Sequence, residues 1–391
     1  MSDSLLVLNV ELYAPEYQGI QDILIINGRI ITIGTNLKEQ IKLPGLHILD
    51  ATGKKAVPGY VDQHVHIIGG GGESGPYSRT PEVMLSDITS AGVTTVIGVL
   101  GTDGTSRHTE SLLAKARGLE AEGVSAYILT GSYEVPLHTV TGDARKDIIL
   151  IDKVLGIGEV ALSDHRSSEP TKEELKKILT QARLGGMLSG KSGVVQFHMG
   201  VGKKGLQVLF DILDESEIPA AHMIPTHINR SVPLFEQAKL LAKRGGYIDI
   251  TSGIREKDGF PECVKPSEAI KDLWNERIPM NQVTMSSDGN GCMSVRLPDG
   301  SAKQLVTKLA SLHEEVRDAV IAGVSIEVAV SVCTSNPARA NGLYPKKGCL
   351  QEGSDGDLLL LDCDFNIDTV IAGGKLMVAD KHVLIKGTFE K

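Results

Sequence analysis

The sequence predicts an α/β protein: a (β/α)8 TIM-like barrel with a smaller β-sandwich domain built from both chain ends. From residue 59 to residue 345, short β-rich runs alternate with amphipathic helical runs, as expected for parallel strands joined by crossover helices. Eight strand candidates fall in this region, and eight parallel strands close a barrel. Residues 1–58 and 346–391 instead hold short alternating runs with turn signals and no long helix. We therefore expect the two ends to pair as one discontinuous sandwich.

The eight predicted strands favour a closed barrel. An open doubly wound sheet is the alternative arrangement, but no GxGxxG motif follows the first strand to support it. In chain order, the eight strands are GYVDQHVHI from Gly59, TTVIGVL from Thr94, AYILTG from Ala126, GEVALSD from Gly158, VVQFHMG from Val194, MIPTHIN from Met223, YIDITSG from Tyr247 and QVTMSSD from Gln282.

Helix signals lie between these strands. The segment TPEVMLSDITSAG is expected to begin with Thr80 as N-cap and Pro81 at the first helical position, and to stop at Gly92. The segment TKEELKKILTQARLGG has a capping box from Thr171 to Glu174, followed by apolar residues at helical spacing. The segment SVPLFEQAKLLAKRGG is a third helix that ends at paired glycines.

The composition is that of an ordinary soluble globular protein and argues against several classes of function. The 391 residues carry a formal net charge of −9 with no long Lys/Arg run, which argues against nucleic-acid binding. The five cysteines form no CxxC pair, as expected in a reducing compartment. We find no signal peptide and no apolar run of the roughly 18 residues that a membrane helix needs. A cytoplasmic protein without a membrane partner is therefore expected.

Histidines and a carboxylate gather at the predicted strand ends. His64 and His66 stand two apart in the first strand, so both imidazoles point to one face, here the barrel interior. His198, His227 and Asp288 occur where later strands pass into their loops. Because these strand ends share one edge of a barrel, and that edge is the catalytic face, the five side chains are expected to meet there.

Glu159 adds a second carboxylate from within the apolar fourth strand. An unpaired carboxylate in such a strand would cost several kcal/mol or become neutral. Four imidazoles and two carboxylates form a good site for two divalent ions about 3.5–4 Å apart. Zn²⁺ is the expected ion, although other transition ions also suit these ligands. We expect Glu159 to bridge the two ions; the alternative is a structural ion pair with Lys153 or Arg166.

Longer motifs resemble the amidohydrolase superfamily over essentially the whole chain. The segments PGYVDQHVHI and TSNPARANGLYPKKGCLQEGSDGDLLLLD, the later single histidines and the strand-eight Asp288 carry this resemblance. More narrowly, DQHVHIIGGGGESGP, LLAKARGLEAEGVSAYILTGSYEVP, SDHRSSEP, FHMG, PTHINRSVPLFEQA and SSDGNG are similar to the isoaspartyl dipeptidase family. The resemblance implies a metal-dependent dipeptidase that cleaves the isopeptide bond of β-aspartyl dipeptides. It also implies a homo-oligomer, with an octamer suggested by the family.

The fourth strand departs from the pattern of that family. Isoaspartyl dipeptidases typically have a Lys there, carboxylated on its amine to bridge the metals, where this chain has Glu159. Both groups offer two oxygens to two ions, but the Glu side chain is several bonds shorter. The segment GEVAL also resembles the GE-I-G-L strand of TatD-like hydrolases, in which a Glu supplies a metal ligand. A carboxylate bridge of this kind would need no CO2 for assembly.

The implied substrate has a free α-ammonium, two α-carboxylates and one scissile amide, and the resemblance assigns partners to each. The run Gly69–Gly72 lets the backbone approach closely, and planar guanidinium groups suit the carboxylates. Each assigned residue could instead have a packing or ion-pairing role. The implied substrate-binding residues are Gly71, Glu73 for the ammonium, Thr102 for orientation, Tyr133 for a hydrogen bond to the oxyanion, Arg166 and Arg230 for the carboxylates, and Cys292.

For catalysis, the resemblance implies a metal-bound hydroxide as nucleophile, formed because the ions lower the pKa of water. Asp288 would accept its proton and pass it to the departing amine, acting as general base and then as general acid. Tyr133 would stabilise the oxyanion. The implied metal ligands are His64 and His66 on one ion, His198 and His227 on the other, Glu159 between them, and Asp288.

Cys292 is a second departure from the family pattern, because the family typically has a Ser there that touches the substrate carboxylate, and a thiol is a poorer donor.

Two other functions stay open. One is another binuclear amidohydrolase, such as a cyclic amidase or an N-acyl-amino-acid deacylase; the charged set Glu73, Arg166 and Arg230 favours a zwitterionic substrate instead. The other is a metal-free scaffold homologue, against which the retained histidines speak.

Overall fold

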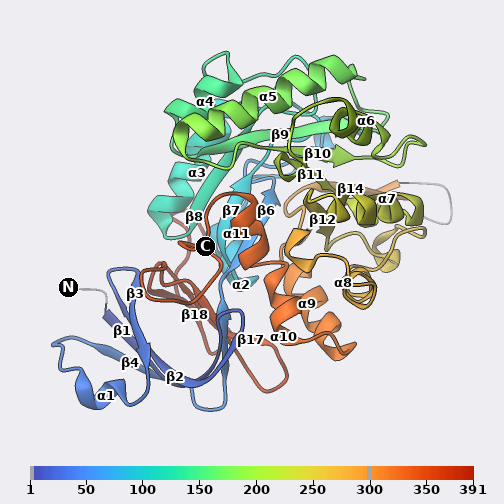
Figure 1. The fold of residues 1–391 in the computed structure, drawn as a ribbon. Coiled ribbons are helices and arrows are strands. Elements are labelled where there is room, and N and C mark those ends of the chain that lie inside the picture. Colours follow the sequence, from blue (N-terminus) through green and yellow to red (C-terminus); the bar gives the residue numbers. More distant parts are fainter. Residues whose placement is uncertain (1–3, 297–301) are drawn as a thin grey trace.

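The computed structural model describes residues 4–296 and 302–391, and it has the predicted two-part architecture (Figure 1). Eight parallel strands among the described residues form the barrel, and the blue N-terminal and red C-terminal strands of Figure 1 lie together beside it. The barrel strands are β6 (Tyr60–Val65), β7 (Val93–Gly98), β8 (Ser125–Thr130), β9 (Val154–Leu162), β10 (Val194–Met199), β11 (Met223–Thr226), β12 (Ile248–Thr251) and β13 (Val283–Ser286).

Two parallel sheets make up the barrel. Strands β6 to β11 form a six-stranded sheet, and β12 pairs with β13. The ring is completed where β11 packs beside β12 and β13 packs beside β6. A parallel bridge joins Val65 to Gly289, and the His66 amide donates to the Gly289 carbonyl over 2.9 Å. The ends of the first and eighth strands are therefore held side by side.

Two helices lie where predicted, although the first of them continues to Ser189, beyond the predicted segment that ended at Gly186. In α5 (Lys172–Ser189), the Thr171 hydroxyl accepts from the Glu174 amide while the Glu174 carboxylate accepts from the Thr171 amide, which confirms the capping box. α7 (Val232–Lys243) ends just before the paired glycines. The other described helices are α1 (Leu37–Gln40), α2 (Leu85–Ser90), α3 (Thr109–Glu122), α4 (Ala144–Leu150), α6 (Gln207–Glu215), α8 (Pro266–Asn275), α9 (Ser311–Ile321), α10 (Ile326–Ser331) and α11 (Ser335–Ala340).

α2 begins later than predicted, so the assignment of Thr80 as its N-cap is wrong. The Thr80 hydroxyl instead accepts from the Gly70 amide and donates to the Asn290 carbonyl, both over 2.7 Å. These bonds tie the segment before α2 to the glycine run and to the loop after the eighth strand. That segment stays non-helical because its polar groups serve these loops.

Both chain ends build one nine-stranded sheet, as predicted, in the order β19-β18-β17-β16-β5-β1-β2-β3 with β4 also paired to β1. Because β1 pairs with β4 over its first part and with β5 near its end, the sheet divides there and encloses its own apolar core. The boundaries after residues 58 and 345 stay predictions. The strands are β1 (Ser4–Tyr13), β2 (Tyr17–Ile26), β3 (Arg29–Gly34), β4 (His47–Asp50), β5 (Lys55–Pro58), β16 (Leu358–Leu361), β17 (Ile367–Ala372), β18 (Lys375–Ala379) and β19 (His382–Val383).

An antiparallel hairpin that the sequence analysis did not predict follows the eighth barrel strand. It consists of β14 (Cys292–Arg296) and β15 (Ala302–Val306).

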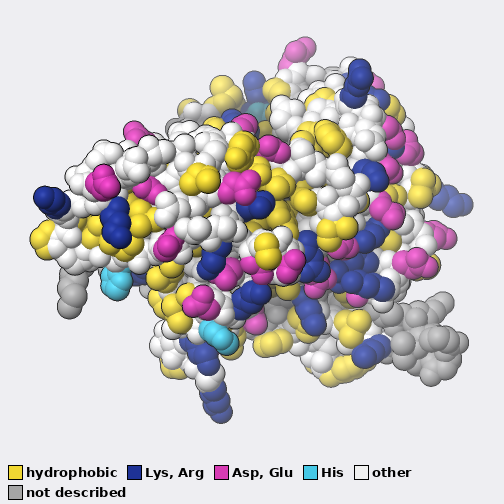
Figure 2. All heavy atoms as spheres, turned by 90° about the horizontal axis from the view of Figure 1, so that it is seen from below, with side chains coloured by type: hydrophobic (Ala, Val, Ile, Leu, Met, Phe, Trp, Pro, Cys, Tyr) yellow, Lys and Arg dark blue, Asp and Glu magenta, His cyan; other side chains and the backbone are white. Residues whose placement is uncertain are grey.

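On the face drawn in Figure 2, acidic and basic side chains are interspersed, so charge of a single sign does not cover this face. Among the described residues, no helix combines the length and apolar character needed to cross a bilayer.

His313 of α9 links the barrel to the terminal sheet. Its Nδ1 lies 2.8 Å from the Tyr60 hydroxyl, and its Nε2 lies 2.9 Å from the Phe365 carbonyl. A neutral ring satisfies both contacts, because Nδ1 accepts from the hydroxyl while Nε2–H donates to the carbonyl. Burial lowers the pKa of His313 to about 4, so the folded protein keeps this ring neutral.

We predict that acid destabilises the native protein more than a His313→Gln variant. Between about pH 6.5 and pH 4, the unfolded chain binds a proton at His313 and the folded chain does not. Stability therefore falls as the pH falls, by up to about 3 kcal/mol from this residue. Gln can accept and donate similarly without titrating. Urea unfolding of both proteins near neutral pH and at about pH 4.5 measures the difference; equal losses would contradict the prediction.

Candidate metal centre and substrate pocket

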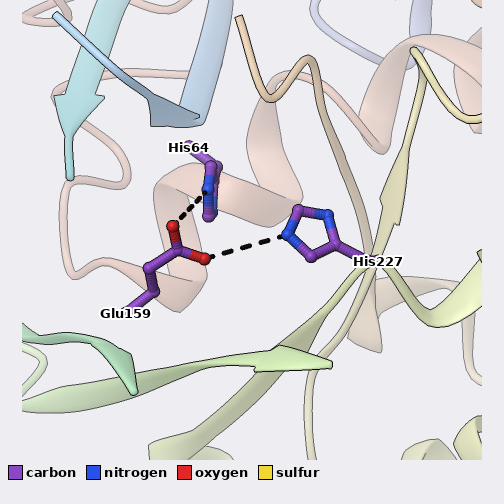
Figure 3. Close-up of side chains that lie close together, drawn as sticks. All are labelled: His64, Glu159 and His227. Carbon is purple, nitrogen blue, oxygen red and sulfur yellow. Dashed lines mark ion pairs between the residues drawn. The ribbon is translucent and has the colours of Figure 1, made fainter. Parts of the chain in front are cut away.

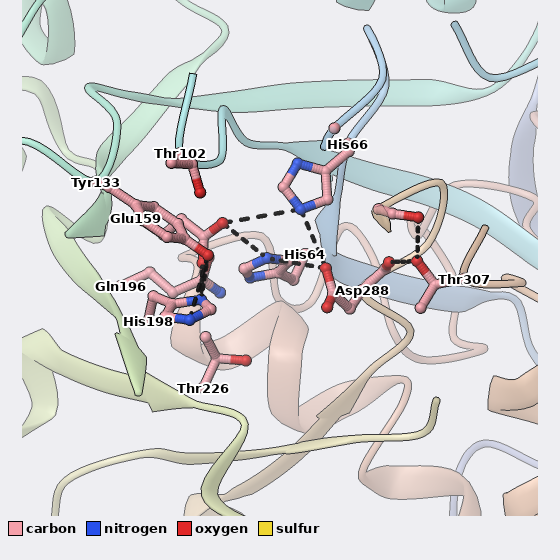
Figure 4. Close-up of polar contacts among 12 residues, drawn as sticks. His64, His66, Thr102, Tyr133, Glu159, Gln196, His198, Thr226, Asp288 and Thr307 are labelled. Atoms are coloured by element: carbon pink, nitrogen blue, oxygen red, sulfur yellow. Dashed lines mark hydrogen bonds and ion pairs between the residues drawn. The ribbon is translucent and has the colours of Figure 1, made fainter. Parts of the chain in front are cut away.

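The six predicted metal ligands meet at the edge of the barrel where the strands pass into their loops; Figure 4 labels all of them except His227, which Figure 3 labels. His227 and Asp288 adopt positive φ angles of 62° and 54°, which are uncommon for residues other than glycine and often mark functional sites. The ligands come from five strands: His64 lies in β6 and His66 just beyond it, Glu159 in β9, His198 in β10, His227 after β11 and Asp288 after β13.

Glu159 is fully buried, and each of its two oxygens faces a different pair of imidazoles. Oε1 lies 3.4 Å from Nε2 of His64 and 3.8 Å from Nε2 of His66. Oε2 lies 3.1 Å from Nδ1 of His198 and 3.8 Å from Nε2 of His227. Figure 3 shows the carboxylate between His64 and His227. One carboxylate thus stands between two potential ion sites.

The alternative reading, a structural ion pair between Glu159 and Lys153 or Arg166, is wrong. Lys153 pairs with Glu120, and Arg166 pairs with Asp164 and Glu73. Histidines therefore surround Glu159 in place of a permanent cation.

Asp288 lies on the His64 and His66 side of the centre. Its Oδ1 is 3.1 Å from Nε2 of His66 and 3.6 Å from Nε2 of His64. Burial opposes ionisation of Asp288, but the neighbouring imidazoles lower its pKa. An ionised carboxylate at this position can ligate an ion or accept a proton.

Unpaired polar atoms test whether these residues fit metal ions. His64 Nδ1 and Nε2, His66 Nδ1 and Glu159 Oε1 are buried without a hydrogen-bond partner in the described part of the chain. Such atoms are uncommon in proteins, and an ion is one explanation for them. Potential ligand atoms lie within 4.8 Å of one another in two groups: His64, Glu159 and His227; and His64, His66 and Asp288. The residues therefore fit transition-metal ions.

Without an ion, the buried groups interact strongly with one another. Burial lowers the pKa of His64, but the Glu159 carboxylate outweighs it and raises that pKa to about 9. Burial raises the pKa of Glu159, and His64 with the hydrogen bonds from His198 and His227 lowers it well below its usual value. Glu159 is therefore ionised, and the site attracts positive charge.

A cavity of about 500 Å³ opens beside the metal centre, and its lining includes all seven predicted substrate-binding residues. His66, His198 and Asp288 also line it, whereas His64, Glu159 and His227 are fully buried behind them. The cavity therefore brings the predicted binding groups and the predicted metal ligands together.

The charged groups of the cavity contact one another. Arg166 Nη1 lies 3.1 Å from Glu73 Oε1, and the Thr102 hydroxyl donates to the same oxygen over 2.7 Å. Burial raises the pKa of Glu73, but Thr102 and Arg166 lower it below its usual value. Glu73 is thus an anion that a substrate ammonium can approach.

Tyr133 and Arg230 both reach His198. The Tyr133 hydroxyl lies 2.6 Å from Nδ1 of that ring, and burial raises the pKa of Tyr133 well above its usual value. The phenol is therefore neutral and can donate a hydrogen bond. Arg230 Nη1 donates to the Met199 carbonyl over 2.9 Å, while its Nε has no partner among the described residues.

Gly71 and Cys292 are in close contact. A Cβ atom on Gly71 would lie 2.5 Å from Cys292 Cβ and 2.4 Å from the Ser78 carbonyl oxygen, and Gly71 has a φ of +72°. The position therefore requires glycine. The Cys292 thiol contacts Gln304 Oε1 at 3.2 Å, so the thiol lies between the cavity and β15.

Sequence reasoning missed Arg107, a buried residue that holds the glycine run. Its guanidinium donates to the Gly70 carbonyl over 2.9 Å and to the Gly71 carbonyl over 3.1 Å, with longer bonds to the Ile68 and Thr80 carbonyls. No motif marks Arg107 in the sequence, because the carbonyls that it holds are backbone atoms. Asp164, discussed below, was also missed as a site residue.

Comparison with known protein families and solved structures defines the class of protein. The chain belongs to the amidohydrolase family, whose sequence profile matches residues 56–377. It is therefore a hydrolase, and the predicted barrel with a separate terminal sheet is confirmed by the family and by solved structures.

The beta-aspartyl dipeptidase of Fervidobacterium islandicum AW-1 is similar over nearly the whole chain, with 41% identity, a TM-score of 0.88 and coverage of 97% of this chain and 98% of that one. A structure of that protein in complex with the β-Asp-Leu dipeptide matches with the same identity and TM-score. The predicted resemblance to isoaspartyl dipeptidases is thus confirmed.

Two more distant relatives place the chain more broadly. L-hydantoinase of Paenarthrobacter aurescens is 25% identical, and the match spans 92% of this chain and 85% of the hydantoinase. Dihydropyrimidinase from Brevibacillus agri has a TM-score of 0.70 at 15% identity, with coverage of 97% of this chain and 96% of that one, and shows the fold alone.

We predict that Arg107→Met loosens the glycine run without removing metal-binding capacity. Buried carbonyls left without a donor cost about 1–3 kcal/mol each, so the thermal midpoint should fall and residues 68–80 should become sensitive to protease. Arg79→Met is the matched control, because Arg79 shares the Asp103 partner but is partly exposed and contacts no carbonyl of the run. Unchanged proteolysis in Arg107→Met would contradict the prediction.

Proposed function

We propose that this chain hydrolyses the isopeptide bond of β-aspartyl (isoaspartyl) dipeptides in a metal-dependent reaction. The similarity to a beta-aspartyl dipeptidase supports the proposal. The observation that carries it is the position of Glu159, which offers one oxygen to each of two imidazole pairs behind a charged pocket. A carboxylate so placed can join two ions at the reacting bond.

Recognition of the substrate depends on complementary charge. The dipeptide has one ammonium and two carboxylates, and the cavity offers the Glu73 carboxylate with the Arg166 and Arg230 guanidinium groups. Glu73 binds the ammonium, and the guanidinium groups bind the carboxylates through paired N–H donors. Gly71 permits close approach of the backbone, and Thr102 orients Glu73 through their hydrogen bond. Each charged group of the dipeptide thus has a partner of opposite charge in the pocket.

The metal ligands divide into two sets around Glu159. His64 and His66 face one of its oxygens, with Asp288 beside them, and His198 and His227 face the other. When bound, two divalent ions supply an activated water and polarise the scissile carbonyl. The protein holds the ligands rigidly, because all of them lie in barrel strands or directly after them.

Asp288 transfers the protons, and Tyr133 donates a hydrogen bond. The Asp288 side chain is 17% exposed and lines the cavity, so it can accept a proton from the attacking water and pass it to the leaving amine. The neutral Tyr133 phenol donates to the oxygen that gains negative charge. In the structure this hydroxyl contacts His198, so it must turn towards the substrate.

A cyclic amidase is the second candidate, because L-hydantoinase is a relative over most of the chain. A neutral cyclic amide would leave the Glu73 and Arg166 charges without substrate partners, which favours the dipeptide. An N-acyl amino acid, tested beside β-Asp-Leu and a cyclic amide, would examine the deacylase alternative. Zinc as the ion, a cytoplasmic location and a homo-oligomer, with an octamer suggested by the resemblance, stay predictions.

We predict that the native protein binds about two ions per chain and hydrolyses β-Asp-Leu, and that Glu159→Gln loses both properties. The variant should lose at least about a hundredfold in kcat, since residues that merely support metal ligands already contribute 10–100-fold. Asp147→Asn is the matched control, because Asp147 is as buried as Glu159 but bonds to Thr130 and Thr141 outside the cavity lining. Metal analysis and steady-state kinetics measure both quantities.

The possible results separate the candidate functions. Two ions and full activity in Glu159→Gln would contradict the bridging role. Metal binding with hydrolysis of cyclic amides alone would favour the second candidate. Neither metal nor hydrolysis in the native protein would leave the scaffold alternative.

A further inference from the structure

We infer that Asp164 is a positioning residue that serves both halves of the site: it orients the His198 ring for metal binding and holds Arg166 for the substrate carboxylate. Asp164 lies just after β9, and its side chain is 5% exposed. The part concerning the substrate rests on the proposed function, whereas the part concerning the metal does not.

The contact with Arg166 uses one edge of the guanidinium. Asp164 Oδ1 accepts from Arg166 Nε and Oδ2 accepts from Arg166 Nη2, both over 2.9 Å. This bidentate pair leaves Nη1 directed at Glu73, 3.1 Å away, on the cavity side. Because a fork of two parallel bonds fixes the plane of the group, Asp164 determines which guanidinium N–H groups face the substrate.

The contact with His198 determines which ring nitrogen faces the ions. Nδ1 of His198 lies 3.1 Å from Glu159 Oε2 and 3.0 Å from Nε2 of His227, so Nδ1 is the atom directed at the metal centre. A neutral imidazole that binds metal through Nδ1 carries its proton on Nε2. That Nε2 lies 3.2 Å from Asp164 Oδ2, which can accept the proton.

Two guanidinium groups also lie beside Nε2 of His198. Arg166 Nη2 and Arg230 Nη1 lie 3.0 Å and 3.2 Å from the same Nε2 of His198. Guanidinium groups are donors only, so a protonated Nε2 would otherwise face donors with like polarity. Asp164 Oδ2 accepts from Arg166 Nη2 and lies 3.2 Å from His198 Nε2, so it is an acceptor within reach of a protonated Nε2.

The local backbone is shaped to bring Asp164 against β10. A Cβ atom on Gly200 would lie 2.6 Å from Asp164 Cβ and 2.3 Å from the Ser163 carbonyl oxygen. The Gly200 amide donates to the Leu162 carbonyl over 3.0 Å, and the Gly202 amide donates to the Ser163 carbonyl over 2.7 Å. The glycines after β10 thus admit the turn that carries Asp164.

The test is Asp164→Asn, with two separate readouts. The first is Zn²⁺ affinity, measured without substrate by competition with a chromophoric chelator; we expect it to fall by about 10–100-fold. The second is β-Asp-Leu hydrolysis at saturating Zn²⁺; we expect KM to rise at least about tenfold with kcat within about threefold, because a guanidinium no longer held in its binding geometry weakens substrate binding.

Asp357→Asn is the matched control. The Asp357 side chain is 6% exposed, and it pairs with the buried Lys347 over 2.6 Å, outside the lining of the cavity. It should lower stability while leaving Zn²⁺ affinity and KM unchanged. If Asp164→Asn fails to fold, Asp164→Glu is measured in its place. This variant keeps the negative charge but displaces the contacts with Arg166 and His198. We expect a lower Zn²⁺ affinity and a higher KM than in the native protein, with smaller changes than those expected for Asp164→Asn.

The readouts also separate this inference from the proposed function. Native Zn²⁺ affinity and native KM in the Asp164 variants would overturn the inference, and a change in one quantity alone would overturn the shared role. If the native protein does not hydrolyse β-Asp-Leu, the proposed function fails. An unchanged Zn²⁺ affinity would then overturn the inference by itself.

Discussion

The ionised Glu159 carboxylate, buried among four imidazoles, is the constraint on which the rest of the site depends. A buried charge without a counter-charge is strongly destabilising, and no Lys or Arg side chain contacts Glu159 among the ion pairs of the described residues. The imidazoles come from β6, from β10 and from the loop after β11, so they reach Glu159 only when these strands lie in one barrel. The candidate metal ligands therefore come together only when the barrel has folded.

The pocket beside that centre contains charges that already neutralise one another. Arg166 contacts both Asp164 and Glu73, and Arg230 Nη1 lies 3.9 Å from Asp164 Oδ2, so each of these charges has a neighbour of opposite sign before a substrate binds. A dipeptide with an ammonium and two carboxylates would exchange the Glu73–Arg166 contact for contacts of the same kind. A neutral amide would offer no such exchange. Selectivity for a zwitterion would therefore follow because only a charged substrate offers Glu73 and Arg166 new partners once their own contact is broken.

Much of the site could be predicted because barrel topology maps strand ends to one edge. The two-residue spacing of His64 and His66 was sufficient to place them on one face. Thr80 was misassigned because its hydroxyl bonds to the Gly70 amide and to the Asn290 carbonyl, 210 positions away. Asp164 and Arg107 were missed as site residues for a similar reason: Asp164 contacts His198 of a later strand, and Arg107 bonds to backbone carbonyls. Local sequence predicts an element and its face, but not such contacts.

Anomalous X-ray scattering would show whether Glu159 joins two metal ions, as we propose. Crystals of the protein prepared with Zn²⁺ would be measured above and below the zinc absorption edge. We expect two anomalous peaks, one beside Glu159 Oε1 with His64 and His66, the other beside Oε2 with His198 and His227. Two peaks that Glu159 does not contact, or a single peak held by histidines alone, would contradict this proposal.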